Sequence, residues 1–197
     1  RRVIDQFLQA RLLSAQAALE ATATLHDSVL PAETTHNFLF IADILRRWHA
    51  LDHPISPPRE HRGRLLTQYF TSNQFELRRS KRLPLLSGDE ALQTQLIMEL
   101  WKEFLLITKP IPVRINQRGD KLTIRFDYEK LPVNYLQVFS RRRPTDWLMD
   151  HLTLQNLTAW LWYQEFLNAG IKASASSSQP HSFSLSFQVV TQLSLPF

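Results

Sequence analysis

Apolar residues recur at helical spacing over the first 52 residues of the chain. At steps of three and four they form a stripe through Ile4, Leu8, Leu12, Ala15, Leu19, Thr22, Leu25 and Val29, and after a step of nine the pattern continues at Phe38, Ile41, Leu45 and Trp48. The stripe predicts one long helix, kinked at Pro31 because proline removes a backbone hydrogen bond. A helix of this length is longer than a globular domain needs, which favours a helical bundle shared between two chains.

A proline-rich loop over residues 53–58 ends this helix, and a second helical pattern follows over residues 59–77. Two helices joined by a short loop predict an antiparallel hairpin. The basic run at residues 78–82 then reads as a linker. We therefore expect a helical-hairpin domain at residues 1–80 and a second domain at residues 81–197.

The second half of the chain mixes helical and strand patterns. Helices are predicted over residues 90–106 and 147–169, and apolar residues alternate at period two on both sides of a turn at residues 116–120. A strand is predicted over residues 171–175, and a second one where phenylalanine, leucine and serine alternate after residue 181. The fold class is therefore α+β, a sandwich with helices on one face of a mixed or antiparallel sheet.

Composition narrows the chemistry. The 197 residues are 44% hydrophobic and 21% charged, include no cysteine and carry a formal net charge of +5. Thiolate chemistry is excluded, and four glycines argue against a glycine-rich phosphate loop. The charge permits an acidic partner, but its distribution does not indicate nucleic acid. There is no run of 18 apolar residues, no signal-peptide pattern and no initiator methionine before Arg1, so we expect a fragment of a longer cytoplasmic protein without membrane insertion.

The segment at residues 25–31 carries a specific motif. His26 is followed by Asp27 and, five positions later, by Pro31. This resembles the phospho-acceptor box in the transmitter region of sensor histidine kinases. The resemblance implies a homodimeric four-helix bundle, a response-regulator receiver domain as partner, phosphate carried on His26, and proton transfer or ring orientation by Asp27.

The second domain resembles the ATP-binding domain of the same family in its order of elements, but it departs at the nucleotide site. Counting from Asp89, the two asparagines of the family fall on Glu99 and Glu103. The adenine-binding aspartate falls on Tyr128 or, with a slip of one residue, on Asp127, and its two glycines are absent. These departures predict a degenerate site, with binding of ATP and Mg²⁺ weak or absent and no metal or other cofactor.

Three functions remain open at this point. The first is a two-component protein, a histidine phosphotransferase or pseudo-histidine kinase, that relays phosphate through His26 to or from a response-regulator aspartate. The second is a non-catalytic pseudokinase that serves as an interaction scaffold. The third is a divergent but active kinase that uses Glu99 or Glu103 for Mg²⁺.

Overall fold

The computed structural model describes residues 1–25, 32–51, 59–62, 64, 84–107, 110–128, 131–178 and 181–190. The chain divides into two compact units, Arg1–His53 and Pro54–Phe197. This division falls at residues 53 and 54, whereas the sequence suggests a boundary at residues 80 and 81.

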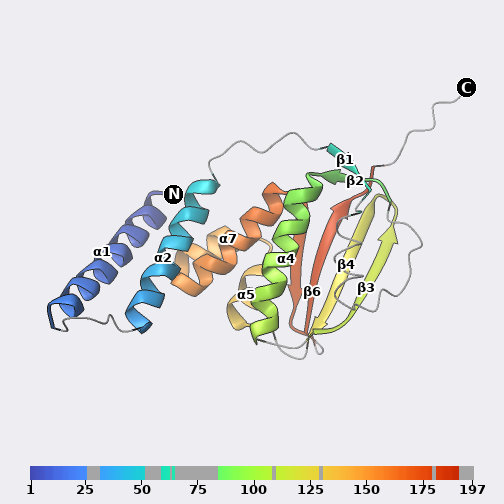
Figure 1. Cartoon of the computed structure of the whole chain (residues 1–197). Coiled ribbons are helices and arrows are strands. Elements are labelled where there is room, and N and C mark those ends of the chain that lie inside the picture. The colour runs from blue at the N-terminus through green and yellow to red at the C-terminus, as the bar shows by residue number, and fades with distance from the viewer. Residues whose placement is uncertain are drawn as a thin grey trace, which may run out of the picture. The chain divides into compact units, whose positions relative to one another are not determined.

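The first unit is a helical hairpin. Helix α1 (Arg2–Leu25) and helix α2 (Ala32–Ala50) run antiparallel, as Figure 1 shows. Its buried apolar side chains recur at helical spacing and come from both helices: Ile4, Leu8, Ile41, Ile44 and Trp48. The prediction of one continuous long helix is wrong, because the chain reverses direction between α1 and α2. Apolar residues recur at helical spacing in both α1 and α2 because each helix buries one apolar face.

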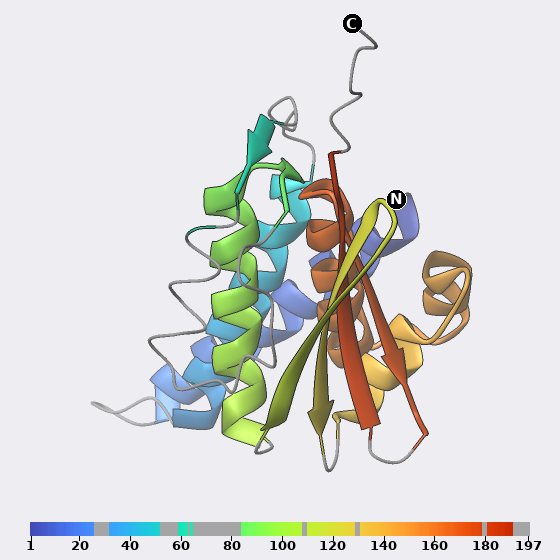
Figure 2. The ribbon, with the colours of Figure 1, turned by 90° about the vertical axis from the view of Figure 1, so that its right-hand side faces the viewer.

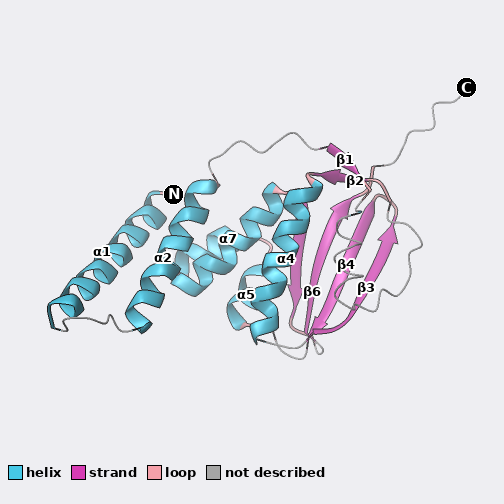
Figure 3. Cartoon of the chain, in the orientation of Figure 1, coloured by secondary structure: helices cyan, strands magenta, loops and turns pink. Residues whose placement is uncertain are grey.

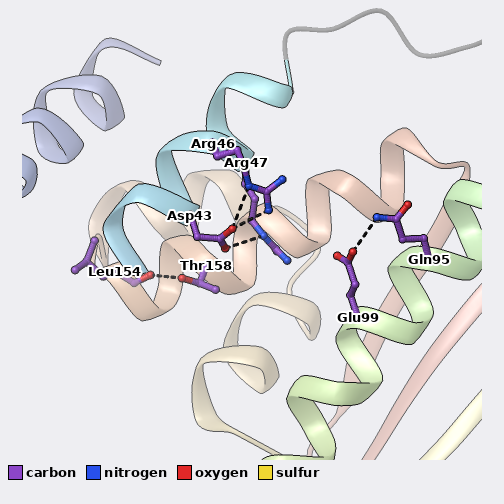
Figure 4. A network of polar contacts seen from close by, with 7 residues as sticks. All are labelled: Asp43, Arg46, Arg47, Gln95, Glu99, Leu154 and Thr158. Atoms are coloured by element: carbon purple, nitrogen blue, oxygen red, sulfur yellow. Dashed lines mark hydrogen bonds and ion pairs between the residues drawn. The ribbon is translucent and has the colours of Figure 1, made fainter. Parts of the chain in front are cut away.

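Polar contacts fix the two helices of the hairpin. Trp48 Nε1, near the end of α2, donates a hydrogen bond of 2.7 Å to Asp5 Oδ1 in the first turn of α1. The guanidinium of Arg1 lies 5.4 Å from the centre of the Trp48 ring, a cation–π distance. Within α2, Asp43 pairs with Arg46 at 2.7 Å and with Arg47 at 3.2 Å (Figure 4). The bond between Asp5 and Trp48 sets the register of the hairpin.

The second unit is a two-layer sandwich, seen by element type in Figure 3. Its sheet has four antiparallel strands in the order β3-β4-β6-β5: β3 (Pro110–Arg118), β4 (Lys121–Tyr128), β6 (His181–Gln188) and β5 (Ile171–Ser176). Helices α4 (Glu90–Ile107), α5 (Val133–Phe139) and α7 (Leu154–Asn168) lie on one side of it (Figure 1). The predicted α+β class is confirmed, with an antiparallel sheet.

A second, two-stranded sheet lies at one end of the sandwich. Strand β1 (Arg59–His61) pairs antiparallel with β2 (Leu86–Gly88), and β2 bridges to Val189 just after β6. The helix predicted over residues 59–77 is therefore wrong at its start. Residues 65–77 lie outside the described part of the chain.

The predicted helix over residues 147–169 is two helices in the structure. Helix α6 (Pro144–Asp150) starts with a proline in its first turn, and α7 starts at a new cap, where the Thr153 hydroxyl accepts a hydrogen bond of 3.1 Å from Asn156 N. Helix α7 ends before Gly170, whose φ of 74° suits glycine. Between caps, α7 buries much of its surface: Leu157, Ala159, Trp160, Leu161, Trp162 and Phe166.

Candidate functional site

The two residues expected to carry phosphate chemistry, His26 and Asp27, lie outside the described residues. The structure describes their flanks, Leu25 at the end of α1 and Ala32 at the start of α2.

Glu99 and Glu103 both belong to α4, where a spacing of four residues puts them on one face of the helix. Glu99 accepts a hydrogen bond of 2.8 Å from Gln95 Nε2, one turn earlier on the same helix (Figure 4). The side chain of Glu103 lies outside the described part of the structure. Within the described ranges, no group of three or more His, Cys, Asp or Glu residues could hold a metal ion.

Asp127 and Tyr128 are neighbours in strand β4, and their side chains lie on opposite faces of the sheet. The side chains of a strand alternate between the two faces of its sheet, and Leu122, Ile124, Phe126 and Tyr128 are the buried series that faces the helices. Asp127 belongs to the opposite series, with Thr123 and Arg125. Of the two alternative positions for an adenine-binding carboxylate, the one that faces the helical layer is therefore a tyrosine.

Asp127 is buried on the outer face between two arginines. Its side chain is 1% exposed, and Oδ1 accepts a hydrogen bond of 2.6 Å from Arg125 Nε. Its Oδ2 lies 3.1 Å from Arg114 Nε, an ion pair without the alignment of a hydrogen bond. The side chains of Arg114 and Arg125 are 63% and 43% exposed. The Asp127 carboxylate therefore forms a structural ion pair with Arg114 and Arg125, on the face of the sheet opposite the helices.

The last residue of α5 is Phe139, which begins an aromatic cluster. Phe139 is 3% exposed, and its ring centre lies 4.9 Å from that of Phe183 on β6 and 5.7 Å from that of Tyr163 on α7. Both contacts are edge-on, the favoured geometry for aromatic pairs. Phe139 therefore packs into the core between the helices and the sheet.

A buried polar cluster that the sequence does not reveal joins β1, β2 and α4. Gln93 is fully buried, and its Nε2 donates to Ser87 O at 3.1 Å and to Ala169 O at 2.8 Å. Its Oε1 lies 3.0 Å from His61 Nε2. Because Oε1 accepts only, His61 Nε2 is the donor. A Cβ on Gly88, whose φ is 133°, would clash with Gln93 Nε2.

A second feature missed from the sequence is the row of basic residues on the outer side of β3 and β4. Arg114 stands opposite Arg125, and Arg118 stands opposite Lys121. The signal was present, because these cations alternate with the apolar residues that predict the strands. The row can be recognised only when the pairing of β3 with β4 is known, because the pairing shows which basic residues stand opposite each other.

Comparisons with known proteins agree with this architecture. No family model matches the chain, and no curated protein matches it by sequence. A solved structure of the Acinetobacter baumannii histidine kinase AdeS is similar with a TM-score of 0.54, over 93% of this chain and 98% of that one, at 8% identity. At this identity the likeness concerns the fold, and the chain has a histidine-kinase-like fold.

Two further structures are less similar. The nucleotide-free catalytic domain of the histidine kinase ThkA has a TM-score of 0.48 and 11% identity, over 70% of this chain and 100% of that one. Full-length ShkA has a TM-score of 0.47 and 12% identity, over 97% of this chain and 47% of that one.

None of the described helices has the length and apolar character needed to cross a membrane.

Proposed function

We propose that this protein is a two-component signalling protein that relays a phosphoryl group through His26 and whose kinase-like domain does not use ATP. The proposal that the kinase-like domain does not use ATP rests on the arrangement of side chains along β4. Tyr128 belongs to the series that faces the helices, and Asp127 is held on the other side of the sheet by Arg114 and Arg125.

The described residues do not fit ATP with Mg²⁺. On the helix-facing side of β4, the position for an adenine-binding carboxylate holds Tyr128, and Asp127 belongs to the other series. Glu99 already accepts from Gln95, and a carboxylate there repels a triphosphate that approaches without its cation. No chemical step is therefore assigned to ATP.

The proposed chemistry needs a neutral imidazole on His26. One ring nitrogen attacks the phosphorus of an aspartyl phosphate on a receiver domain; the P–N bond forms, the P–O bond breaks and the receiver regains its carboxylate. The other ring nitrogen releases its proton to Asp27. The reverse sequence delivers the phosphoryl group to a second receiver, so neither direction needs ATP.

The hairpin supports a homodimer. Among the described side chains of α1 and α2, the buried apolar ones are Ile4, Leu8, Ile41, Ile44 and Trp48, whereas Val3, Leu13 and Leu39 are 55%, 59% and 61% exposed. A four-helix bundle built from two hairpins would bury more apolar surface than one hairpin can. We therefore include dimerisation through residues 1–53, and a cytoplasmic location alongside receiver domains, in the same proposal.

The test is a phosphotransfer assay with the full chain, its His26→Gln variant and a matched His36→Gln variant, which changes an exposed histidine of α2. One arm uses a panel of receiver domains labelled on aspartate, and the other uses labelled ATP with Mg²⁺. We expect acid-labile label from receivers only, at least 100-fold less in His26→Gln and unchanged in His36→Gln. Light scattering should give the same dimer for all three proteins.

Two outcomes would overturn the proposal. Label from ATP would favour the divergent kinase, and loss of that label in Glu103→Ala would identify its metal ligand. No label from a broad receiver panel, with the dimer intact, would favour the non-catalytic scaffold.

A further inference from the structure

The outer face of the four-stranded sheet is basic. Figure 2 looks onto this face, with α7 behind the strands. From the register of the strands, the outward positions hold five basic residues: Arg114, Arg118, Lys121, Arg125 and Lys172. Among the described outward strand positions, the only acid is Asp127, which is buried. Five cations and one carboxylate give this single face a formal charge of +4, against +5 for the whole chain.

The basic residues oppose one another in the sheet. Of the three outward pairs between β3 and β4, two join like charges, Arg114 with Arg125 and Arg118 with Lys121. Like charges directly across a strand pair destabilise a sheet. Asp127 neutralises part of the first pair. Among the described side chains, no ion pair neutralises Arg118 or Lys121 of the second pair, and an anion bound there would relieve its repulsion.

Hydroxyl groups occupy most of the other outward positions. The outward positions of β6, β5 and β4 supply six: Ser182, Ser184, Ser186, Ser174, Ser176 and Thr123. Ser182 and Ser186 are buried, whereas the other four are partly or fully exposed, and each of these four can donate a hydrogen bond to an anionic oxygen. The aromatic side chains of these strands, Phe126, Tyr128, Phe183 and Phe187, all belong to the buried inner series. The described residues of the outer face therefore offer no stacking platform for nucleic-acid bases and no apolar anchor for a membrane.

We propose that the outer face of the β3-β4-β6-β5 sheet is a docking surface for an extended, acidic protein segment. The carboxylates on one side of an extended chain repeat at about 6.8 Å, the same repeat as the outward residues of a strand. Arginine binds carboxylates through two parallel hydrogen bonds, and serine hydroxyls satisfy the remaining acceptor positions. The inference is independent of phosphate transfer, because it uses no residue of the first unit.

The test measures binding of a fluorescein-labelled peptide of six Glu-Ser repeats to the full chain by polarisation. The sheet variant is Arg118→Glu/Lys121→Glu/Lys172→Glu, at exposed positions remote from the Asp127 ion pair. The matched control is Arg141→Glu/Arg142→Glu/Arg143→Glu, three exposed arginines outside the sheet with the same change in net charge. A Gln-Ser peptide, a 20-base-pair duplex and phosphatidylserine vesicles serve as further probes.

We expect binding of the Glu-Ser peptide to weaken at least tenfold in the sheet variant and at most twofold in the control, and to decrease with added salt. Circular dichroism should be unchanged in both variants. Equal losses in the two variants would overturn the proposal, because they would indicate an effect of net charge alone. Binding of the Gln-Ser peptide equal to that of Glu-Ser, no peptide binding, or tighter binding of duplex or vesicles would overturn it as well.

Discussion

The two faces of the four-stranded sheet are built from alternate residues of the same strands, and they differ in almost every physical property. The inner face is apolar and nearly dry, with Phe126, Phe183, Leu185 and Phe187 each at most 2% exposed. The outer face is hydroxylic and basic, and it holds a buried carboxylate between two arginines. The inner face supplies the buried apolar surface of the sandwich, whereas the outer face carries more basic charge than its one buried carboxylate neutralises.

The largest expected effect comes from the inner face. Phe183→Ala removes a ring that contacts Phe139 and Phe166. It should lower the free energy of unfolding by about 3–5 kcal/mol, because it leaves a cavity in a packed core. Amide hydrogen exchange of β4 and β6 measures the sandwich unit separately from the hairpin. The control, Ser184→Ala on the outer face, should change stability by less than about 0.5 kcal/mol; equal losses would contradict the contrast between the faces.

The next effect concerns Asp127. Asp127→Asn removes the charge that holds Arg125 and Arg114, and it leaves two cations opposite each other. The expected loss is about 1–2 kcal/mol, because charged hydrogen bonds contribute about that much and the arginines are partly exposed. Urea unfolding at low and high salt measures it, and the loss should shrink in high salt.

Arg125→Gln, alone and combined with Asp127→Asn, completes a double-mutant cycle for this ion pair. Independent effects of the two substitutions would mean that the pair does not organise the outer face.

The smallest effect should have the opposite sign. Lys121→Glu places a carboxylate directly across from Arg118, where the native pair is repulsive. Stability should rise by about 0.2–1 kcal/mol, and Lys121→Gln should give only part of that gain. Thermal unfolding at low ionic strength measures the shift. A loss of stability in Lys121→Glu would mean that this outward pair is not repulsive in the folded protein.

Much of the sandwich was predictable from the sequence, because its strands alternate cleanly. The serine and phenylalanine alternation of β6 identifies both the strand and its inner face. The break between α6 and α7 was not predictable, because apolar residues continue at helical spacing across it. The reversal after α1 was misread as a kink, since Pro31 signals an interruption without giving its angle. Strand β1 has three residues, too few for a periodic pattern.

For the candidate site, the sequence identified positions but could not orient them. Asp127 and Tyr128 are neighbours, and a shift of one residue exchanges the two faces of a strand. The alternation of apolar residues already places Tyr128 on the inner face, but it does not decide which of the two residues takes the place of the aspartate in the resembled family. The cluster around the fully buried Gln93 has no sequence pattern that could predict it, because its partners Ser87, His61 and Ala169 come from three separate segments.

The pairing of β1 with β2 determines where the chain can be shortened. A fragment that begins at residue 81 would lack His61, and Gln93 Oε1 would lose its hydrogen-bond donor in a buried position. It would also turn β2 into an open strand edge, a template for pairing between molecules. A soluble, separately expressed sandwich should therefore begin before Arg59, so that the short strand following the hairpin is produced with the fold to which it belongs.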